Sequence, residues 1–220
     1  MDTPADAVAD GPVWVVVVAA GTGARYGGAK QYEPLGGRRV LDWSLAAARS
    51  AADGVVLVVG AGAPVDEEVE RTVVGGATRS ASVRAGLAAV PDEASIVLVH
   101  DAARPLASPA LFAAVVAAVR GGADAVVPGL APVDTIRHRD GGVVDRSQLV
   151  AVQTPQGFRS DVLRAAYAGG GDASDDAGLV EAAGRVVEVV EGEPPNRKIT
   201  TPDDLAVAEA LLAVDSGIAR

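Results

Sequence analysis

The sequence contains no cysteine among its 220 residues, so it offers neither a disulfide framework nor a thiolate metal site. This absence is consistent with a reducing cytoplasm, which is the compartment that we expect. Aromatic residues are also scarce, at 3%, although 49% of the residues are apolar. The core must therefore be built from valine, leucine, isoleucine and alanine. Valine suits buried strands and alanine suits helices, so the composition favours an α/β protein.

Long apolar runs and targeting signals are absent as well. The longest apolar runs have only the length of a strand, so we expect no membrane span, and the N-terminus does not resemble a secretory signal. The net charge of −10 argues against nucleic-acid binding, and any bound anion needs a locally basic pocket. Residues 1–12 are expected to form a loose tail. Residues 13–220 are long enough for one domain with a sizeable core.

Lysine is nearly absent from the chain. Of the 19 basic residues, only Lys30 and Lys198 are lysines. A compositional bias towards arginine explains the scarcity but not the two lysines that remain. An ammonium is a compact point charge, whereas a guanidinium is a planar fork. We therefore hypothesise that both lysines occupy positions where arginine cannot serve; the alternative is that they are incidental.

Apolar runs and helical spacing alternate along the chain. Continuous apolar runs predict buried strands at residues 13–19, 55–60, 96–100 and 125–128. Helical spacing and helix-start signals predict helices at residues 41–51, 64–71, 80–90 and 109–120, and a last helix from Pro202. The alternation predicts a single Rossmann-like α/β domain, with a mostly parallel sheet flanked by helices on both faces.

One segment departs from this rhythm. Residues 133–139 and 143–150 flank the hairpin turn signal Asp140-Gly141-Gly142. Both flanks carry several charged side chains, so this hairpin cannot bury a face in its own core. It is either a solvated flap or an arm that projects and pairs with another subunit, and the pattern alone leaves both open.

The first chemical motif follows the first predicted strand, as Ala-Ala-Gly-Thr-Gly-Ala-Arg-Tyr over residues 19–26. Glycines let backbone N–H groups approach a phosphate chain closely, although an ordinary tight turn is the alternative. The loop lacks the Gly-Lys-Ser/Thr ending of a P-loop, and Tyr26 takes the place of the third glycine of a dinucleotide fingerprint. Arg25 and Lys30 add two cations, which favours a triphosphate.

The second motif is His-Asp-Ala-Ala-Arg-Pro, which begins at His100 at the carboxyl end of a predicted strand. Open α/β sheets bind ligands at that edge. Asp101 is a candidate magnesium ligand, because magnesium usually takes one or two protein carboxylates together with phosphate oxygens. A helix cap or an ion pair with Arg104 is the alternative for Asp101. His100 is expected to support the strand end rather than to bind metal.

Three further segments could contribute to a site. Gly75-Gly76, with Arg79, Ser80 and Ser82 following, is a second glycine-rich turn before a predicted helix, and it could hold the edge of a base. A basic stretch, residues 196–200, precedes the last helix, where an ordinary surface strand is the alternative. Residues 153–158 are followed by Ser174-Asp175-Asp176, a triplet typical of a helix N-cap.

The order and spacing of four blocks resemble the 2-C-methyl-D-erythritol 4-phosphate cytidylyltransferases of the non-mevalonate isoprenoid pathway. The blocks are Ala-Ala-Gly-x-Gly-x-Arg with Lys30-Gln31 downstream, His-Asp-Ala-Ala-Arg-Pro, Thr-Pro-Gln, and the late Lys-Ile-Thr. The resemblance runs from about residue 13 to the last helix. It implies transfer of CMP from CTP to a polyol phosphate, with Mg²⁺ as cofactor. It also implies a homodimer formed through the arm at residues 133–150.

The resemblance also implies residue roles. The CTP-binding residues would be Ala19, Ala20, Gly21, Gly23, Gly76, Ser82 and Ala102. The catalytic residues would be Arg25, Lys30 and Lys198, with Asp101 as the metal ligand. Thr135, Arg146 and Arg104 would hold the sugar phosphate. The chain departs from the usual family pattern at Ala29, Ala77 and Ser174. The alternatives are an enzyme for another polyol phosphate such as ribitol 5-phosphate, one for another nucleotide base, and a non-catalytic nucleotide-sensing protein.

Overall fold

The main sheet supports the whole molecule. The computed structural model describes residues 11–64 and 66–215, and in these residues the sheet has eight strands. At its centre β1 (Val13–Ala19) pairs in parallel with β4 (Gly54–Val59) on one side and with β6 (Ile96–Asp101) on the other. These three strands are valine-rich and almost wholly buried, as their continuous apolar runs predict.

The outer strands complete a mostly parallel sheet, which confirms the predicted fold class. β5 (Arg71–Val74) continues the parallel order beyond β4, and β7 (Ala125–Leu130) pairs in parallel with β10 (Val187–Glu191) at the opposite edge. Two strands run against this direction. β9 (Gln156–Arg159) lies between β6 and β7, and the short β8 (Ala151–Val152) pairs with β7.

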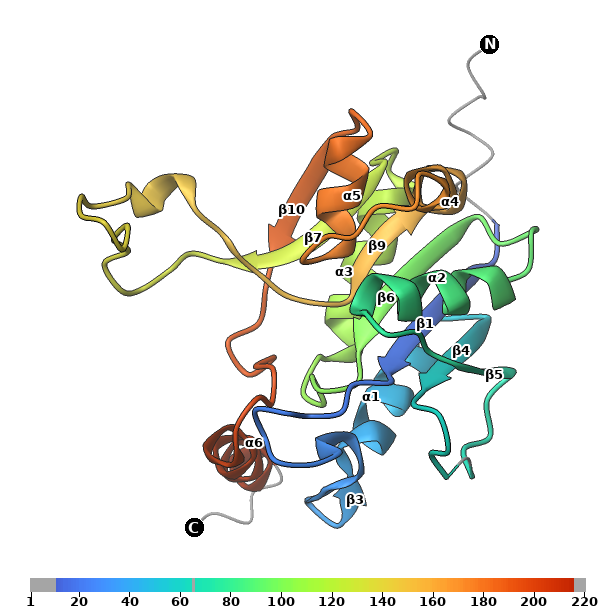
Figure 1. Ribbon diagram of the computed structural model, residues 1–220, viewed down its shortest axis with the longest axis horizontal. Coiled ribbons are helices and arrows are strands. Elements are labelled where there is room, and N and C mark those ends of the chain that lie inside the picture. The colour runs from blue at the N-terminus through green and yellow to red at the C-terminus, as the bar shows by residue number, and fades with distance from the viewer. Residues whose placement is uncertain (1–10, 65, 216–220) are drawn as a thin grey trace.

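Helices cover both faces of the sheet (Figure 1). The aliphatic side chains of α1 (Val40–Arg49) and α3 (Pro109–Arg120) pack on one face. Those of α2 (Arg79–Ala89), α4 (Ser160–Ala168) and α5 (Asp176–Ala182) pack on the other. The last helix, α6 (Pro202–Asp215), packs against a small ribbon of β2 (Pro34–Leu35) and β3 (Arg38–Arg39).

The predicted helix-start signals are confirmed. The Ser108 hydroxyl accepts a hydrogen bond from the backbone N–H of Leu111 at 3.1 Å, directly before α3. Asp204 accepts from the backbone N–H of Thr201 at 2.8 Å, which fixes the start of α6. Asp175 caps α5 through the backbone N–H of Gly178 at 3.1 Å. Each side chain satisfies a backbone donor that the first helical turn leaves without a partner.

The predicted helix at residues 64–71 is wrong. The described residues of this stretch form a loop, and Arg71 already begins β5. Acidic side chains four residues apart repel each other on a helix, as Asp66 and Glu70 would. In the loop they find separate partners instead. Asp66 lies 2.9 Å from the guanidinium of Arg39, and Glu70 accepts a hydrogen bond from the backbone N–H of Val55 at 2.7 Å.

Residues 131–150 leave the end of β7 as an arm that projects from the body and returns to β8 (Figure 1). The predicted turn is present: Gly141 and Gly142 have positive φ angles, and Arg137 forms an isolated bridge with Val143. The two predicted hairpin strands do not form in the described arm, and its return limb carries a 3-10 turn, η3 (Arg146–Gln148). A lone two-stranded ribbon is marginally stable in water, which explains the irregular limbs.

Of the expected tail, residues 1–10 lie outside the described residues. Its last residue is held rather than loose, because the carbonyl of Pro12 accepts a hydrogen bond from the backbone N–H of Ser95 at 2.9 Å. Within the described part of the chain, no helix combines the length and the apolar character needed to cross a membrane.

Candidate active site

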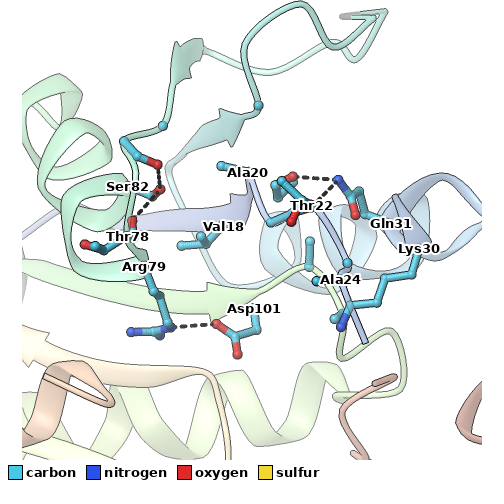
Figure 2. Close-up of a pocket in the computed structure, with 18 of the residues that line it drawn as sticks. Val18, Ala20, Thr22, Ala24, Lys30, Gln31, Thr78, Arg79, Ser82 and Asp101 are labelled. Carbon is cyan, nitrogen blue, oxygen red and sulfur yellow. Dashed lines mark hydrogen bonds and ion pairs between the residues drawn. The ribbon is translucent and has the colours of Figure 1, made fainter. Parts of the chain in front are cut away.

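A cavity of about 750 Å³ opens at the carboxyl ends of the parallel strands. It is lined by the loop after β1, by the turn after β5 and by Asp101, the last residue of β6 (Figure 2). Lys198 joins from the loop before α6, far away in the sequence. Because the carboxyl ends of parallel strands meet at one edge of the sheet, the fold brings these segments together.

Two glycine-dependent contacts shape this cavity. Gly23 has a φ of +66°, and a Cβ there would lie 1.8 Å from the carbonyl oxygen of Gly28, so the loop after β1 closes as tightly as glycine allows. A Cβ at Gly75 would lie 2.5 Å from the Cβ of Ala20. The turn after β5 therefore packs directly against the loop after β1, and both present backbone groups to the cavity.

Gln31 fixes the start of the glycine-rich loop. This buried side chain donates hydrogen bonds to the carbonyl oxygens of Ala19 at 2.9 Å and Gly21 at 3.3 Å. It lies in the short helix η2 (Lys30–Tyr32), next to Lys30. One short segment thus anchors the loop and carries a catalytic candidate. The sequence offered Gln31 only as a member of a block, without a role.

Asp101 is 7% exposed and uses both carboxylate oxygens. Oδ1 accepts from Nε of Arg79 at 3.1 Å, and Oδ2 accepts from Nζ of Lys198 at 2.5 Å. Burial alone would raise the pKa of Asp101. The charges of Arg79 and Lys198 outweigh burial and hold the pKa far below its usual value. The ion pairs of this carboxylate are therefore with Arg79 and Lys198, rather than with Arg104.

Lys30 belongs to a cluster of cations. Partial burial lowers its pKa, and the nearby charges of Lys198 and Arg25 lower it further, while Asp101 opposes them weakly. All three cations line the cavity. Crowded cations favour a polyanionic ligand, because a bound anion relieves their mutual repulsion. This is the locally basic pocket that an acidic chain needs in order to bind a triphosphate.

His100 supports the strand end, as expected. Its side chain is fully buried, its Nδ1 lies 3.2 Å from Oγ1 of Thr154, and its ring packs 5.0 Å from the ring of Phe112. Burial lowers the pKa of His100 to about 4, so the ring is neutral at physiological pH. The Thr154 hydroxyl also accepts from the backbone N–H of Asp101 at 3.1 Å, which fixes the end of β6.

The loop that carries Lys198 is held by polar side chains. Buried Asn196 donates to the carbonyl of Thr154 at 2.9 Å and to Oε1 of Gln153 at 3.2 Å. Arg104 donates to the carbonyl of Asn196 at 2.8 Å and to that of Val152 at 3.3 Å. Sequence reasoning assigned no role to Gln153 or Asn196, although both lie in the segments that it singled out.

The structure gathers the predicted CTP and catalytic residues at one place. The following predicted residues line the cavity: Ala19, Ala20, Gly21, Gly23, Arg25, Lys30, Gly76, Ser82, Asp101, Ala102 and Lys198. The three predicted sugar-phosphate residues lie elsewhere in the described chain. Arg104 donates to the loop that carries Lys198, and Thr135 and Arg146 lie on the arm, where Arg146 donates to the carbonyl of Val133. Their roles stay predictions.

A basic cavity of this size at the carboxyl edge of a Rossmann-like sheet, with a buried carboxylate among its lining residues, fits a nucleotidyltransferase. A family model described as 2-C-methyl-D-erythritol 4-phosphate cytidylyltransferase (IspD) matches residues 13–214. The chain belongs to this family. It is a cytidylyltransferase of isoprenoid biosynthesis, as the motifs indicated, and the alternative activities are not favoured.

Individual relatives agree with the family. A protein named 2-C-methyl-D-erythritol 4-phosphate cytidylyltransferase from Nocardia farcinica is 49% identical over 94% of this chain and 96% of its own length. One of the same name from Rhodococcus opacus is 47% identical over 92% and 96%. The crystal structure of the Thermus thermophilus enzyme of this name has a TM-score of 0.81, with 42% identity over 91% of this chain and 98% of that one.

Proposed function

We propose that the cavity aligns CTP and 2-C-methyl-D-erythritol 4-phosphate for direct in-line transfer. An oxygen of the acceptor phosphate forms a bond to the α-phosphorus of CTP, and the bond from that phosphorus to the bridging oxygen breaks, so pyrophosphate leaves. A phosphate monoester has a second pKa of about 6 and is already ionised, so no general base is needed. The convergence of Arg25, Lys30 and Lys198 beside Asp101 carries this proposal.

Three parts of the cavity would divide the binding of CTP. The backbone of the loop after β1, with Arg25 and Lys30, faces the phosphates. The turn at Gly76 and the Ser82 hydroxyl, which donates to the carbonyl of Thr78 at 2.9 Å, offer polar groups to the cytosine. Lys198 lies nearest Asp101 and would stabilise charge at the reacting phosphorus.

Asp101 would hold Mg²⁺. A single carboxylate combined with phosphate oxygens is a donor set that magnesium accepts. Among the described residues, no group of three His, Asp or Glu side chains forms a separate metal site, which leaves binding shared with the substrate as the fitting mode. The ion would neutralise charge on the triphosphate. Lys198 would then share or yield Oδ2, which it now contacts.

The arm would serve a homodimer in the cytoplasm. It projects from the body, and its side chains of Val133 and Val143 are 85% and 61% exposed. Apolar side chains this exposed favour a partner surface. We propose that the arm reaches a second copy of the chain, where Thr135 and Arg146 complete the acceptor side of the partner's cavity.

A pyrophosphate-release assay tests the activity directly. With 2-C-methyl-D-erythritol 4-phosphate as acceptor, CTP should support turnover, and UTP, GTP and ATP should do so poorly. With CTP fixed, a panel of polyol phosphates that includes ribitol 5-phosphate should rank 2-C-methyl-D-erythritol 4-phosphate first by kcat/KM. Faster turnover of another polyol phosphate would contradict the assigned acceptor. Binding of CTP without pyrophosphate release in any mixture would contradict catalysis.

Lys30→Arg and Lys198→Arg should each lower kcat by about tenfold or more, although the charge is kept. A guanidinium is wider than an ammonium, so it cannot place its charge at the same point beside a phosphate. Steady-state kinetics measure kcat, and calorimetric titration checks that CTP still binds.

The matched control is the opposite exchange, Arg120→Lys, at the exposed end of α3, which should leave kcat unchanged. If both lysine variants turn over within about threefold of the parent enzyme, which is under ~1 kcal/mol, the two lysines are incidental.

A further inference from the structure

Arg79 joins the candidate active site to a second buried carboxylate. It lies in the first turn of α2, and its side chain is only 22% exposed. Nε donates to Oδ1 of Asp101 at 3.1 Å, while Nη2 donates to Oδ2 of Asp176 at 2.8 Å. Figure 2 shows the guanidinium lying alongside the Asp101 carboxylate at the border of the cavity. One planar cation thus bridges two acids that are far apart in the sequence.

The far end of this bridge is rigidly held. Asp176 is fully buried at the start of α5, and its other oxygen, Oδ1, accepts from the hydroxyl of Tyr167 at 2.5 Å. The ring of Tyr167 packs against the guanidinium of Arg84, further along α2. Asp176 therefore has a fixed partner on each oxygen. It acts as the anchor of Arg79, and it has no exposure through which it could meet a substrate.

The geometry requires an arginine at this position. A guanidinium can donate from Nε and Nη2 to two carboxylates at the same time, whereas a lysine ammonium at the end of a flexible stem cannot hold both in fixed directions. With Arg79 in place, the charges of Asp101, Asp176, Arg79 and Lys198 balance. Without it, buried Asp176 would lose this ion pair, and the Asp101 side chain would lose the contact that fixes its orientation.

We infer that Arg79 is a positioning residue for catalysis. By occupying Oδ1 of Asp101, it turns Oδ2 towards the cavity, where that oxygen meets Lys198 and would meet the metal. Arg79 thereby sets the place of both charged groups without contacting the reacting atoms. This inference rests on the roles proposed above for Asp101 and Lys198.

The test is a double-mutant cycle of Arg79→Lys with Asp101→Asn. In the parent enzyme, Arg79→Lys should lower kcat by about tenfold or more. In the Asp101→Asn background the same substitution should lower kcat by less than about twofold, because Arg79 acts through the side chain of Asp101. A second readout needs no turnover: calorimetric titration with CTP, with and without Mg²⁺. Arg79→Lys should weaken the gain in CTP affinity that Mg²⁺ provides and leave metal-free CTP binding within about twofold.

The matched control is again Arg120→Lys, which lies at the exposed end of α3 outside the cavity-lining residues and should leave kcat and the magnesium effect unchanged. The inference would be overturned if the loss of kcat in the double variant equals the product of the losses in the two single variants. It would also be overturned if Mg²⁺ raises the CTP affinity of Arg79→Lys as much as it raises that of the parent enzyme. If Arg79→Lys does not fold, Asp176→Asn replaces it in the same cycle with the same criteria. Full activity of Asp101→Asn would instead contradict the proposed role of Asp101, and the inference would fall with it.

Discussion

Asp101→Asn should lower kcat by roughly two to three orders of magnitude. The carboxylate now accepts from Arg79 on one oxygen and from Lys198 on the other. An asparagine has one acceptor oxygen and turns an NH₂ group towards a cation, so one of these two contacts is lost. The charge that would attract Mg²⁺ is lost with it. Turnover measured across a magnesium titration gives the size of the effect.

The variant should remain folded, because Arg79 keeps its contact with Asp176. Its melting temperature should be lower than that of the parent enzyme, because the side chain at position 101 loses one of its two contacts. Calorimetric unfolding checks this. Asp124→Asn provides a matched control: Asp124 also pairs with arginines, at 3.3 Å from Arg185, but it lies at the opposite end of the sheet's strands, before β7. Its substitution should leave kcat unchanged. An unaltered response of Asp101→Asn to magnesium would contradict the metal assignment.

Mixing two inactive variants, Arg146→Ala and Asp101→Asn, should restore activity. If the arm completes the cavity of the partner, each heterodimer contains one site with both lesions and one site with neither. A two-fold axis makes the exchange reciprocal. The recovered activity should approach one functional site per heterodimer after subunit exchange, and pyrophosphate release measures it.

The control mixture joins Asp101→Asn with Lys30→Met. Both lesions lie in the cavity of their own chain, so every heterodimer site carries one lesion and no activity should return. Differently tagged chains, purified through both tags, establish that heterodimers form. If heterodimers of the Arg146→Ala and Asp101→Asn chains are shown to form but recover no activity, each chain builds its own site. A monomer in solution would contradict the arm's proposed role altogether.

The central strands of the sheet, and the motifs that follow them into the cavity, were predictable from local patterns. The runs at residues 13–19 and 96–100 are apolar without interruption, which is typical of strands buried on both faces. Each leads straight into a motif, and the carboxyl ends of parallel strands share one edge. The sequence therefore indicated that Gly21, Asp101 and their neighbours would meet. Lys198 was found because lysine is so scarce in this chain.

The interactions between distant segments were not predictable in this way. Asp176 belongs to a triplet typical of a helix N-cap, a pattern that does not indicate burial, yet it is fully buried against Arg79 and Tyr167. A signal was present in α2: a cation in the first turn of a helix opposes the helix dipole, so Arg79 needed a strong partner. Strand β9 was missed because four residues that include a glycine carry too little periodicity to identify a strand.

The anchoring of the Lys198 loop concerns entropy as well as geometry. A free lysine side chain carries about 2 kcal/mol of rotamer entropy, which must be given up whenever its charge is used at a fixed point. Here Asn196 and Arg104 immobilise the backbone beside Lys198, and Asp101 already receives the ammonium. Much of that ordering is thus completed when the chain folds. Given the role proposed for Lys198, loosening this loop should slow the chemistry more than it weakens the fold, although the hydrogen bonds that hold the loop are made within the protein rather than to a substrate.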